Sequence, residues 1–205
     1  MHRKIIMTCA AIAAFAAFAT PSASAANLKG GGVTIAVGSS ITGVNVGNIL
    51  FTAGNLTVTC STAHVAGMVI TDVGGTILVE VPPYTSHFTG TGNGGDCTSP
   101  LGDVTPTVTS RLCLHLSAGA DVGTVTGCSG SGSVKFSLNI TGVATCKYTA
   151  ASVSSTIITT GDAESVISEA PATEEGGLFL CPDTDKLDMR FVWSTTSGPT
   201  LQFTS

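Results

Sequence analysis

The side chains best suited to chemistry in this sequence are its cysteines, because thiols form disulfides, bind metals or attack substrates. Apart from Cys9, near the start of the chain, they are Cys60, Cys97, Cys113, Cys128, Cys146 and Cys181. None of these six belongs to a tight pair such as CxxC, the spacing typical of zinc sites. An even number of widely spaced cysteines is typical of a disulfide framework in an exported protein. We therefore expect three disulfides and no metal bound by cysteine.

Six cysteines can be joined in many ways, and we predict that neighbours in the sequence pair. The predicted bridges are Cys60–Cys97, Cys113–Cys128 and Cys146–Cys181. The middle bridge has the best support, because residues 111–117 and 122–127 have the pattern of two strands joined by a turn. Such a hairpin places Cys113 nearly opposite Cys128.

Three histidines could act as general bases: His64, His87 and His115. The G-x-S-x-G motif of serine hydrolases is absent, since residues 127–131 (GCSGS) fail at the last position. A Ser–His–Asp triad need not be contiguous, so a secreted hydrolase with a non-local site remains an alternative. No histidine stands out, however, and His115 reads as a partly exposed structural residue. We expect no catalytic residue, no cofactor site and no enzymatic activity.

Acidic residues are concentrated near the C-terminus, where the stretch 181–188 (CPDTDKLD) contains three calcium candidates. Asp183, Asp185 and Asp188 offer the carboxylate oxygens that calcium prefers, although the stretch lacks the spacing of an EF-hand loop. The alternative interpretation is a solvated loop that keeps the protein soluble. Both interpretations are open at this point.

The N-terminus has the three parts of a secretory signal peptide. Arg3 and Lys4 precede an apolar run over residues 5–19, and small residues follow at 23–25. The run is shorter than the ~20 residues that a membrane-spanning helix needs. We predict a signal peptide over residues 1–25, cleavage between Ala25 and Ala26, and a single domain over residues 26–205. The protein is then secreted or displayed at the cell surface, with no membrane span after cleavage.

The composition of the chain after residue 25 excludes some partners. Six basic residues oppose thirteen acidic ones, which gives a net charge of 6 − 13 = −7. A nucleic-acid-binding protein needs a basic surface, so we expect no nucleic-acid partner. Aromatic residues for stacking on sugars are few, which weighs against a carbohydrate-active site. The partner is unknown, and we consider an envelope component or another protein.

Apolar and polar residues alternate with a period of two along most of the chain, as in half-buried strands. The pattern is clearest over residues 134–140, and it recurs at 112–116 and 189–193. About ten such segments, separated by Gly- and Pro-rich turns, predict an all-β, antiparallel β-sandwich that is immunoglobulin-like or jelly-roll-like. The best helix candidate is 163–170, inside an acidic segment over 161–177 that reads as a surface excursion.

Four cysteine-centred stretches carry a resemblance to a known group. They are NLTVTCS (55–61), RLCLHLSAG (111–119), ATCKYT (144–149) and LCPDTDKLDM (180–189). Together they resemble a family of uncharacterised secreted β-rich proteins from high-GC Gram-positive bacteria. That family has no assigned activity, so the resemblance implies a framework rather than a site. A true immunoglobulin domain is not indicated, because Tyr148 follows its cysteine and Trp193 follows all six.

Three functions are compatible with this sequence. The first is an exported, non-catalytic structural or interaction protein of the cell envelope or the extracellular medium. The second is a secreted β-sandwich that binds a small apolar ligand. An apolar cavity of ~300 Å³ or more, with a few converging polar groups, favours that function. The third is the secreted hydrolase, for which a histidine must lie within hydrogen-bonding reach of both an acid and a hydroxyl.

Overall fold

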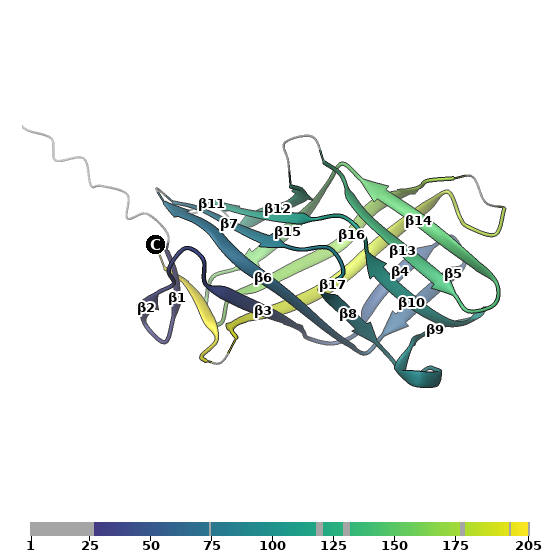
Figure 1. The fold of residues 1–205 in the computed structure, drawn as a ribbon, viewed down its shortest axis with the longest axis horizontal. Coiled ribbons are helices and arrows are strands. Elements are labelled where there is room, and N and C mark those ends of the chain that lie inside the picture. Colours follow the sequence, from purple (N-terminus) through teal and green to yellow (C-terminus); the bar gives the residue numbers. More distant parts are fainter. Residues whose placement is uncertain are drawn as a thin grey trace, which may run out of the picture.

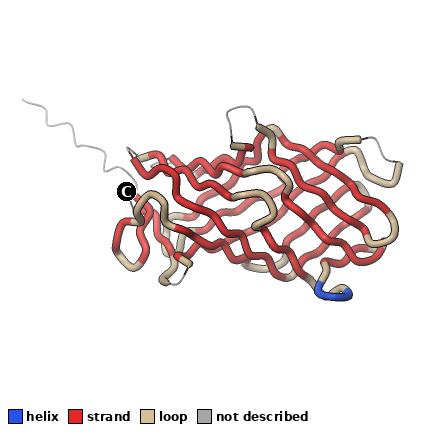
Figure 2. The backbone as a smooth tube through the Cα atoms, viewed as in Figure 1, coloured by secondary structure: helices blue, strands red, loops and turns tan. Residues whose placement is uncertain are grey.

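The structure is a computed structural model that describes residues 27–73, 75–117, 121–128, 132–176, 179–196 and 198–204. The predicted signal peptide and its cleavage site lie outside these residues. The described part is almost entirely antiparallel β-structure, with one short 3-10 helix, η1, over Asn93–Gly95. Figure 2 shows how completely strands make up the molecule. The all-β, antiparallel class expected from the alternation is therefore confirmed.

The described residues form eighteen strands, more than the ten or so expected, because strands also form in segments that were not predicted as strands, such as residues 86–89, 97–99 and 102–108. Their bounds are β1 Asn27–Gly30, β2 Val33–Thr34, β3 Ser40–Asn45, β4 Ile49–Ala53, β5 Leu56–Cys60, β6 Thr62–Val73, β7 Thr76–Val81, β8 Ser86–Thr89, β9 Cys97–Ser99, β10 Gly102–Val108, β11 Leu112–Ser117, β12 Val122–Gly127, β13 Val134–Ile140, β14 Ala144–Ala150, β15 Ser152–Ile158, β16 Glu164–Glu174, β17 Thr184–Thr195 and β18 Leu201–Thr204.

Fifteen of these strands form one sheet, and β18, β1 and β2 form a small second sheet. In the large sheet, β3 also pairs with β6, and β17 also pairs with β16. The hydrogen-bonded strands therefore form two closed circuits, in each of which every strand pairs with the next and the last pairs with the first. One contains β3, β17, β16, β15, β12, β11, β7 and β6, and the other β17, β4, β5, β9, β10, β13, β14 and β16. The long ribbon β16–β17 belongs to both circuits and runs through the elongated molecule (Figure 1).

Strand β16 corrects the expectation of a helix at 163–170 and of a surface excursion over 161–177. Its residues pair with β17 on one side and with β14 and β15 on the other. Small residues, Ala170 and Ala172 among them, turn inward and allow this close pairing. Pro171 follows a bulge between Ile167 and Ala170, where an irregular ladder tolerates a residue without an N–H. The composition of this segment, with acidic residues and a proline, is typical of a loop, yet the segment forms a central strand.

Alternation predicts the inward side chains correctly elsewhere. In β13, Val134, Phe136, Leu138 and Ile140 are buried, and the residues between them face outward or are half-buried. The hairpin of β11 and β12 forms as predicted, with Cys113 opposite Thr126. Its connecting residues, 118–120, lie outside the described part of the chain. Because burial follows the period of two, the apolar core lies between the walls of each circuit.

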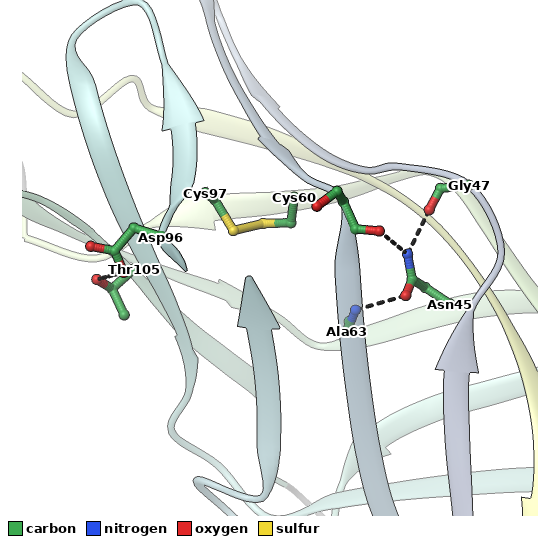
Figure 3. The surroundings of a disulfide bond; sticks show 8 residues. Asn45, Gly47, Cys60, Ala63, Asp96, Cys97 and Thr105 are labelled. Atoms are coloured by element: carbon green, nitrogen blue, oxygen red, sulfur yellow. Dashed lines mark hydrogen bonds between the residues drawn. A yellow bond between two sulfur atoms is a disulfide. The ribbon is translucent and has the colours of Figure 1, made fainter. Parts of the chain in front are cut away.

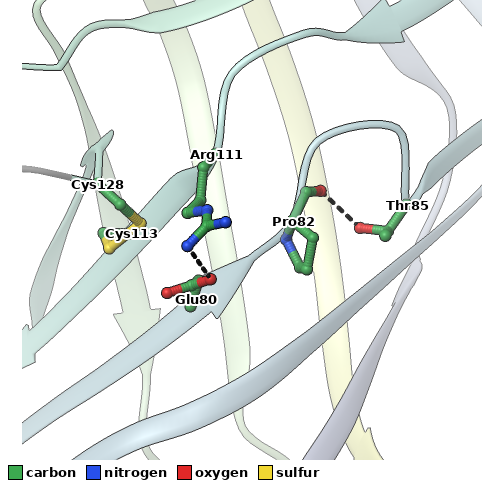
Figure 4. A network of polar contacts seen from close by, with 6 residues as sticks. All are labelled: Glu80, Pro82, Thr85, Arg111, Cys113 and Cys128. Atoms are coloured by element: carbon green, nitrogen blue, oxygen red, sulfur yellow. Dashed lines mark hydrogen bonds and ion pairs between the residues drawn. A yellow bond between two sulfur atoms is a disulfide. The ribbon is translucent and has the colours of Figure 1, made fainter.

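The three disulfides join the pairs that the sequence predicts. Cys60–Cys97 connects β5 with β9, with Cα atoms 4.6 Å apart (Figure 3). Cys113–Cys128 fastens the hairpin and lies beside the ion pair of Arg111 with Glu80, at 3.1 Å (Figure 4). The third bridge, Cys146–Cys181, ties β14 to the segment before β17. Three bridges in one chain indicate folding in an oxidising compartment.

Short polar contacts hold the turns near these bridges. Beside the first bridge, the Asn45 side-chain amide donates to the carbonyls of Gly47 and Ser61, and its Oδ1 atom accepts from the Ala63 N–H at 2.7 Å (Figure 3). Beside the second, the Thr85 hydroxyl donates to the Pro82 carbonyl at 2.8 Å (Figure 4). Each contact satisfies backbone groups where the ladder is interrupted.

Candidate functional site: an internal apolar cavity

An apolar cavity of about 100 Å³ lies in the interior of the molecule. Its lining comes from β4, β6, β7, β8, β10, β11, β12, β13, β15, β16 and β17, so both circuits contribute. Most lining side chains are aliphatic or aromatic, and no charged side chain is among them. The cavity exists because the inward residues of many strands are apolar and do not completely fill the space between the walls.

Five aromatic rings contribute to the cavity wall. Phe51 contacts Phe88 edge-on, with ring centroids 5.8 Å apart, and lies 5.7 Å from Phe136. Phe191 and Trp193 lie with their ring centroids 6.2 Å apart. All five rings line the cavity. Flat, rigid rings of this kind bind apolar molecules with little loss of side-chain entropy.

A few hydroxyl groups interrupt the apolar lining. Ser86, Ser155 and Ser165 are all buried and all line the cavity. The Trp193 indole N–H donates to the Ser165 hydroxyl oxygen at 3.0 Å, which leaves the hydroxyl proton of Ser165 available as a donor. The cavity therefore combines an apolar wall with a small number of polar groups, as ligand sites do.

The volume limits what the cavity can hold. At about 100 Å³ it is smaller than the ~300 Å³ that we set for a typical ligand pocket. It is comparable with apolar cavities of ~150 Å³ that bind benzene and stay dry. The cavity thus fits a small or slender apolar molecule and not a bulky one.

The histidines lie away from this cavity, on the outer surface. His64 and His87 are opposite one another on β6 and β8, and both are exposed. His115 is also exposed, and its Nε2 atom lies 3.3 Å from the Thr126 hydroxyl. Among the hydrogen bonds and ion pairs found for the described residues, none joins a histidine to a carboxylate. The arrangement required for the hydrolase alternative is therefore not present in these contacts.

The three calcium candidates, two on β17 and one just before it, lie in different environments. Asp183 is exposed just before β17, whereas Asp185 is fully buried on the inward face. The Asp188 carboxylate accepts hydrogen bonds from the Ser168 hydroxyl and the Glu169 N–H, so it closes the bulge of β16. Within the described residues, no three His, Cys, Asp or Glu side chains are grouped as metal ligands are. The structure does not bring these aspartates together.

Among the described residues, Asp185 is the charged residue whose burial the sequence interpretation missed. Burial raises the pKa of its carboxyl group to about 7, and the nearby backbone of Lys186 and Thr52 only partly offsets this. Tyr148 is equally buried, and burial, Asp185 and Glu174 together raise the pKa of its phenol. Alternation with Leu187 is the signal that could have placed Asp185 inward. The surrounding polar residues made the segment resemble a loop instead.

Comparison with protein-family models, with curated proteins and with solved structures finds no match for this chain. In the part of the chain that the structure describes, no helix is both long enough and apolar enough to cross a membrane.

Proposed function

We propose that this protein is an exported, non-catalytic protein that binds a small apolar ligand in its internal cavity. The observation that carries the proposal is the nearly continuous apolar lining, drawn from both circuits, with only a few hydroxyl groups. A folded protein gains stability by filling such space with side chains, since unfilled volume forfeits dispersion contacts. A cavity that is kept open and apolar is therefore better explained by a ligand than by packing alone.

The chemistry of the lining specifies the ligand class. A small aliphatic or monocyclic aromatic molecule fits the volume and matches the rings of Phe136 and Trp193. The Ser165 hydroxyl can hydrogen-bond one polar atom, so a ligand with a single hydroxyl or carbonyl group is accommodated. A charged ligand is disfavoured, because no charged side chain lines the cavity to offset its desolvation.

Bromobenzene tests this function directly, because its heavy atom quenches tryptophan fluorescence on contact. Trp193 is the only tryptophan in the chain and lines the cavity, so its emission reports occupancy without interference. We expect saturable quenching by bromobenzene, and competition by toluene that restores the emission. A ligand that binds only the folded state also raises Tm.

Two variants on the same strand separate cavity binding from surface adsorption. Val125 lines the cavity, whereas Val122 is 57% exposed on β12. Val125→Phe fills part of the space and is expected to abolish saturable quenching, whereas Val122→Phe retains it. Quenching that is linear in bromobenzene, or that is equal in both variants, contradicts the proposal.

An envelope-associated interaction role is the second candidate, and one observation favours it. Phe179 is completely exposed and Leu180 is half-exposed, directly before the bridged Cys181. Exposed apolar side chains at a braced turn are common in contact surfaces. We expect wild-type protein to co-sediment with envelope fragments of the producing cells, and Phe179→Ser/Leu180→Ser to remain in the supernatant. Equal sedimentation of both proteins counts against this role.

A further inference from the structure

Strands β8 and β10 are neighbours in the wall of the apolar cavity, but no ladder of hydrogen bonds joins them in the described part of the chain. There β8 pairs only with β6, and residues 105–108 of β10 pair only with β13. Ser86 and Phe88 of β8, and Pro106 and Val108 of β10, line the cavity on the two sides of this seam. The wall can therefore part along the β8–β10 seam without breaking a strand ladder.

A second place where neighbouring strands of the wall lack a ladder, between β12 and β13, is tied more firmly. The Thr109 N–H donates to the Lys135 carbonyl at 2.9 Å, and the Lys135 N–H donates to the Ser110 hydroxyl at 2.8 Å. The Cys128 N–H donates to the Arg111 carbonyl at 3.0 Å. Parting the wall there breaks several hydrogen bonds at once, so the β8–β10 seam offers the less costly path.

The loop over residues 82–85, which joins β7 to β8, spans one end of the β8–β10 seam (Figure 4). Val81 before this loop and Ser86 after it both line the cavity. The Tyr84 N–H donates to the Val108 carbonyl at 3.1 Å, which attaches the loop to the end of β10. Detaching the 82–85 loop from β10 therefore uncovers residues of the cavity wall.

A single hydroxyl group holds the 82–85 loop in its attached position. The Thr85 Oγ1 atom lies 2.8 Å from the Pro82 carbonyl oxygen and 3.2 Å from the Ala66 carbonyl oxygen, as donor to both (Figure 4). The Pro82 contact closes the turn on itself, and the Ala66 contact ties the turn to β6. The attached position thus depends on few polar contacts, and removing one hydroxyl weakens two of them.

The backbone of Tyr84 opposes the attached position. Its φ is 64°, in the left-handed region that residues with a side chain beyond Cβ seldom adopt. The side chain is 65% exposed, so burial of the ring contributes little to offset this strain. A strained conformation held by a few hydrogen bonds lies close in free energy to its relaxed alternative. The loop therefore has two accessible positions, attached to β10 and detached from it.

We propose that the 82–85 loop is the gate through which a small apolar ligand enters and leaves the cavity, passing between β8 and β10. This inference rests on the proposed ligand-binding function. The gate adds no charged group to the cavity lining and acts on the path rather than on the bound ligand. A change in its opening therefore alters the association and dissociation rate constants by the same factor and leaves Kd nearly unchanged.

Stopped-flow quenching of Trp193 by bromobenzene, in the full-length protein, measures both rate constants. Thr85→Val keeps the shape of the side chain and removes its hydrogen bonds, so both rate constants should rise about fivefold, with Kd within about twofold of wild type. Thr200→Val is the matched control, because its hydroxyl donates to Asp162 at 2.6 Å and the residue does not line the cavity. We expect Thr200→Val to leave both rate constants unchanged.

A second variant of the loop should act in the opposite direction. Asparagine adopts the left-handed region more readily than tyrosine, so Tyr84→Asn should stabilise the attached loop and lower both rate constants about threefold. This variant tests the gate even if Thr85→Val does not fold.

The outcomes separate the gate from the binding function. Wild-type protein without saturable quenching overturns the binding function itself, and the gate with it. Saturable quenching in wild type overturns the gate alone if Thr85→Val has wild-type rate constants, if Tyr84→Asn exchanges ligand faster, or if either variant changes Kd through one rate constant only.

Discussion

Single residues explain where this molecule departs from an ordinary β-sheet core. Most inward positions are apolar, and among the described residues Asp185 is a carboxylic acid that is fully buried. A buried acid is stabilised in its neutral form, which makes the free energy of unfolding depend on pH. The sequence shows an aspartate in a polar stretch, and only the register of β17 reveals that it points inward.

The pH dependence of Asp185 has a defined sign. Its folded-state pKa is raised from 3.8 to about 7, so between these values the native state binds a proton that the unfolded state releases. The free energy of unfolding therefore falls as pH rises from about 4 to about 7, and this contribution is constant above pH 7.

Asp185→Asn isolates this effect, because it removes the titration and keeps the shape of the side chain. In EGTA, we expect the variant to be more stable than wild type at pH 8 by a few kcal/mol, on the order given by a shift of about three pKa units. At pH 4 the difference should be small. Urea unfolding at pH 4, 6 and 8 measures it, and a difference that does not vary with pH contradicts the assignment.

Secondary-structure elements divide into those that the sequence predicts and those that only tertiary pairing explains. Strand β13 follows its alternation without exception, and the β11–β12 hairpin predicts the Cys113–Cys128 bridge. Strand β16 was not predicted, because Pro171 and its acidic neighbours have low strand propensity. Hydrogen bonds to strands on both sides of β16 override that propensity, and no local sequence pattern indicates these hydrogen bonds.

The bulge in β16 depends on a side chain that was considered a calcium candidate. Glu169 adopts φ 49°, an unfavourable conformation for a non-glycine residue, and Asp188 accepts hydrogen bonds from Glu169 and Ser168 at 2.8 and 3.2 Å. Asp188→Ala is expected to cost about 1–2 kcal/mol of unfolding free energy. The exposed Asp183→Ala should cost less than about 0.5 kcal/mol.

Chemical denaturation of the two alanine variants measures this difference. A loss of stability for Asp188→Ala that calcium neither restores nor enlarges indicates a structural role at the bulge. Equal stability of the two variants contradicts the claim that Asp188 holds the bulge.

At the scale of the whole molecule, the cavity is formed by many strands together, and no single segment determines it. Its lining comes from eleven strands, among them β4 near the N-terminal end and β17 near the C-terminal end. Alternation predicts that Phe136 and Trp193 face inward, but not that they line the same space. The predicted disulfides and strand class constrain the architecture, whereas the closure of the sheet through β3–β6 and β16–β17 depends on long-range pairing.

Native mass spectrometry of the protein purified from the cells that naturally make it tests the central claim most directly. We expect wild type to carry a small, organic-extractable molecule that is released on denaturation. Val122→Phe should carry the same molecule, and Val125→Phe should lack it. A bare polypeptide in wild type, under gentle conditions that preserve other apolar complexes, contradicts the claim that the cavity is a ligand site.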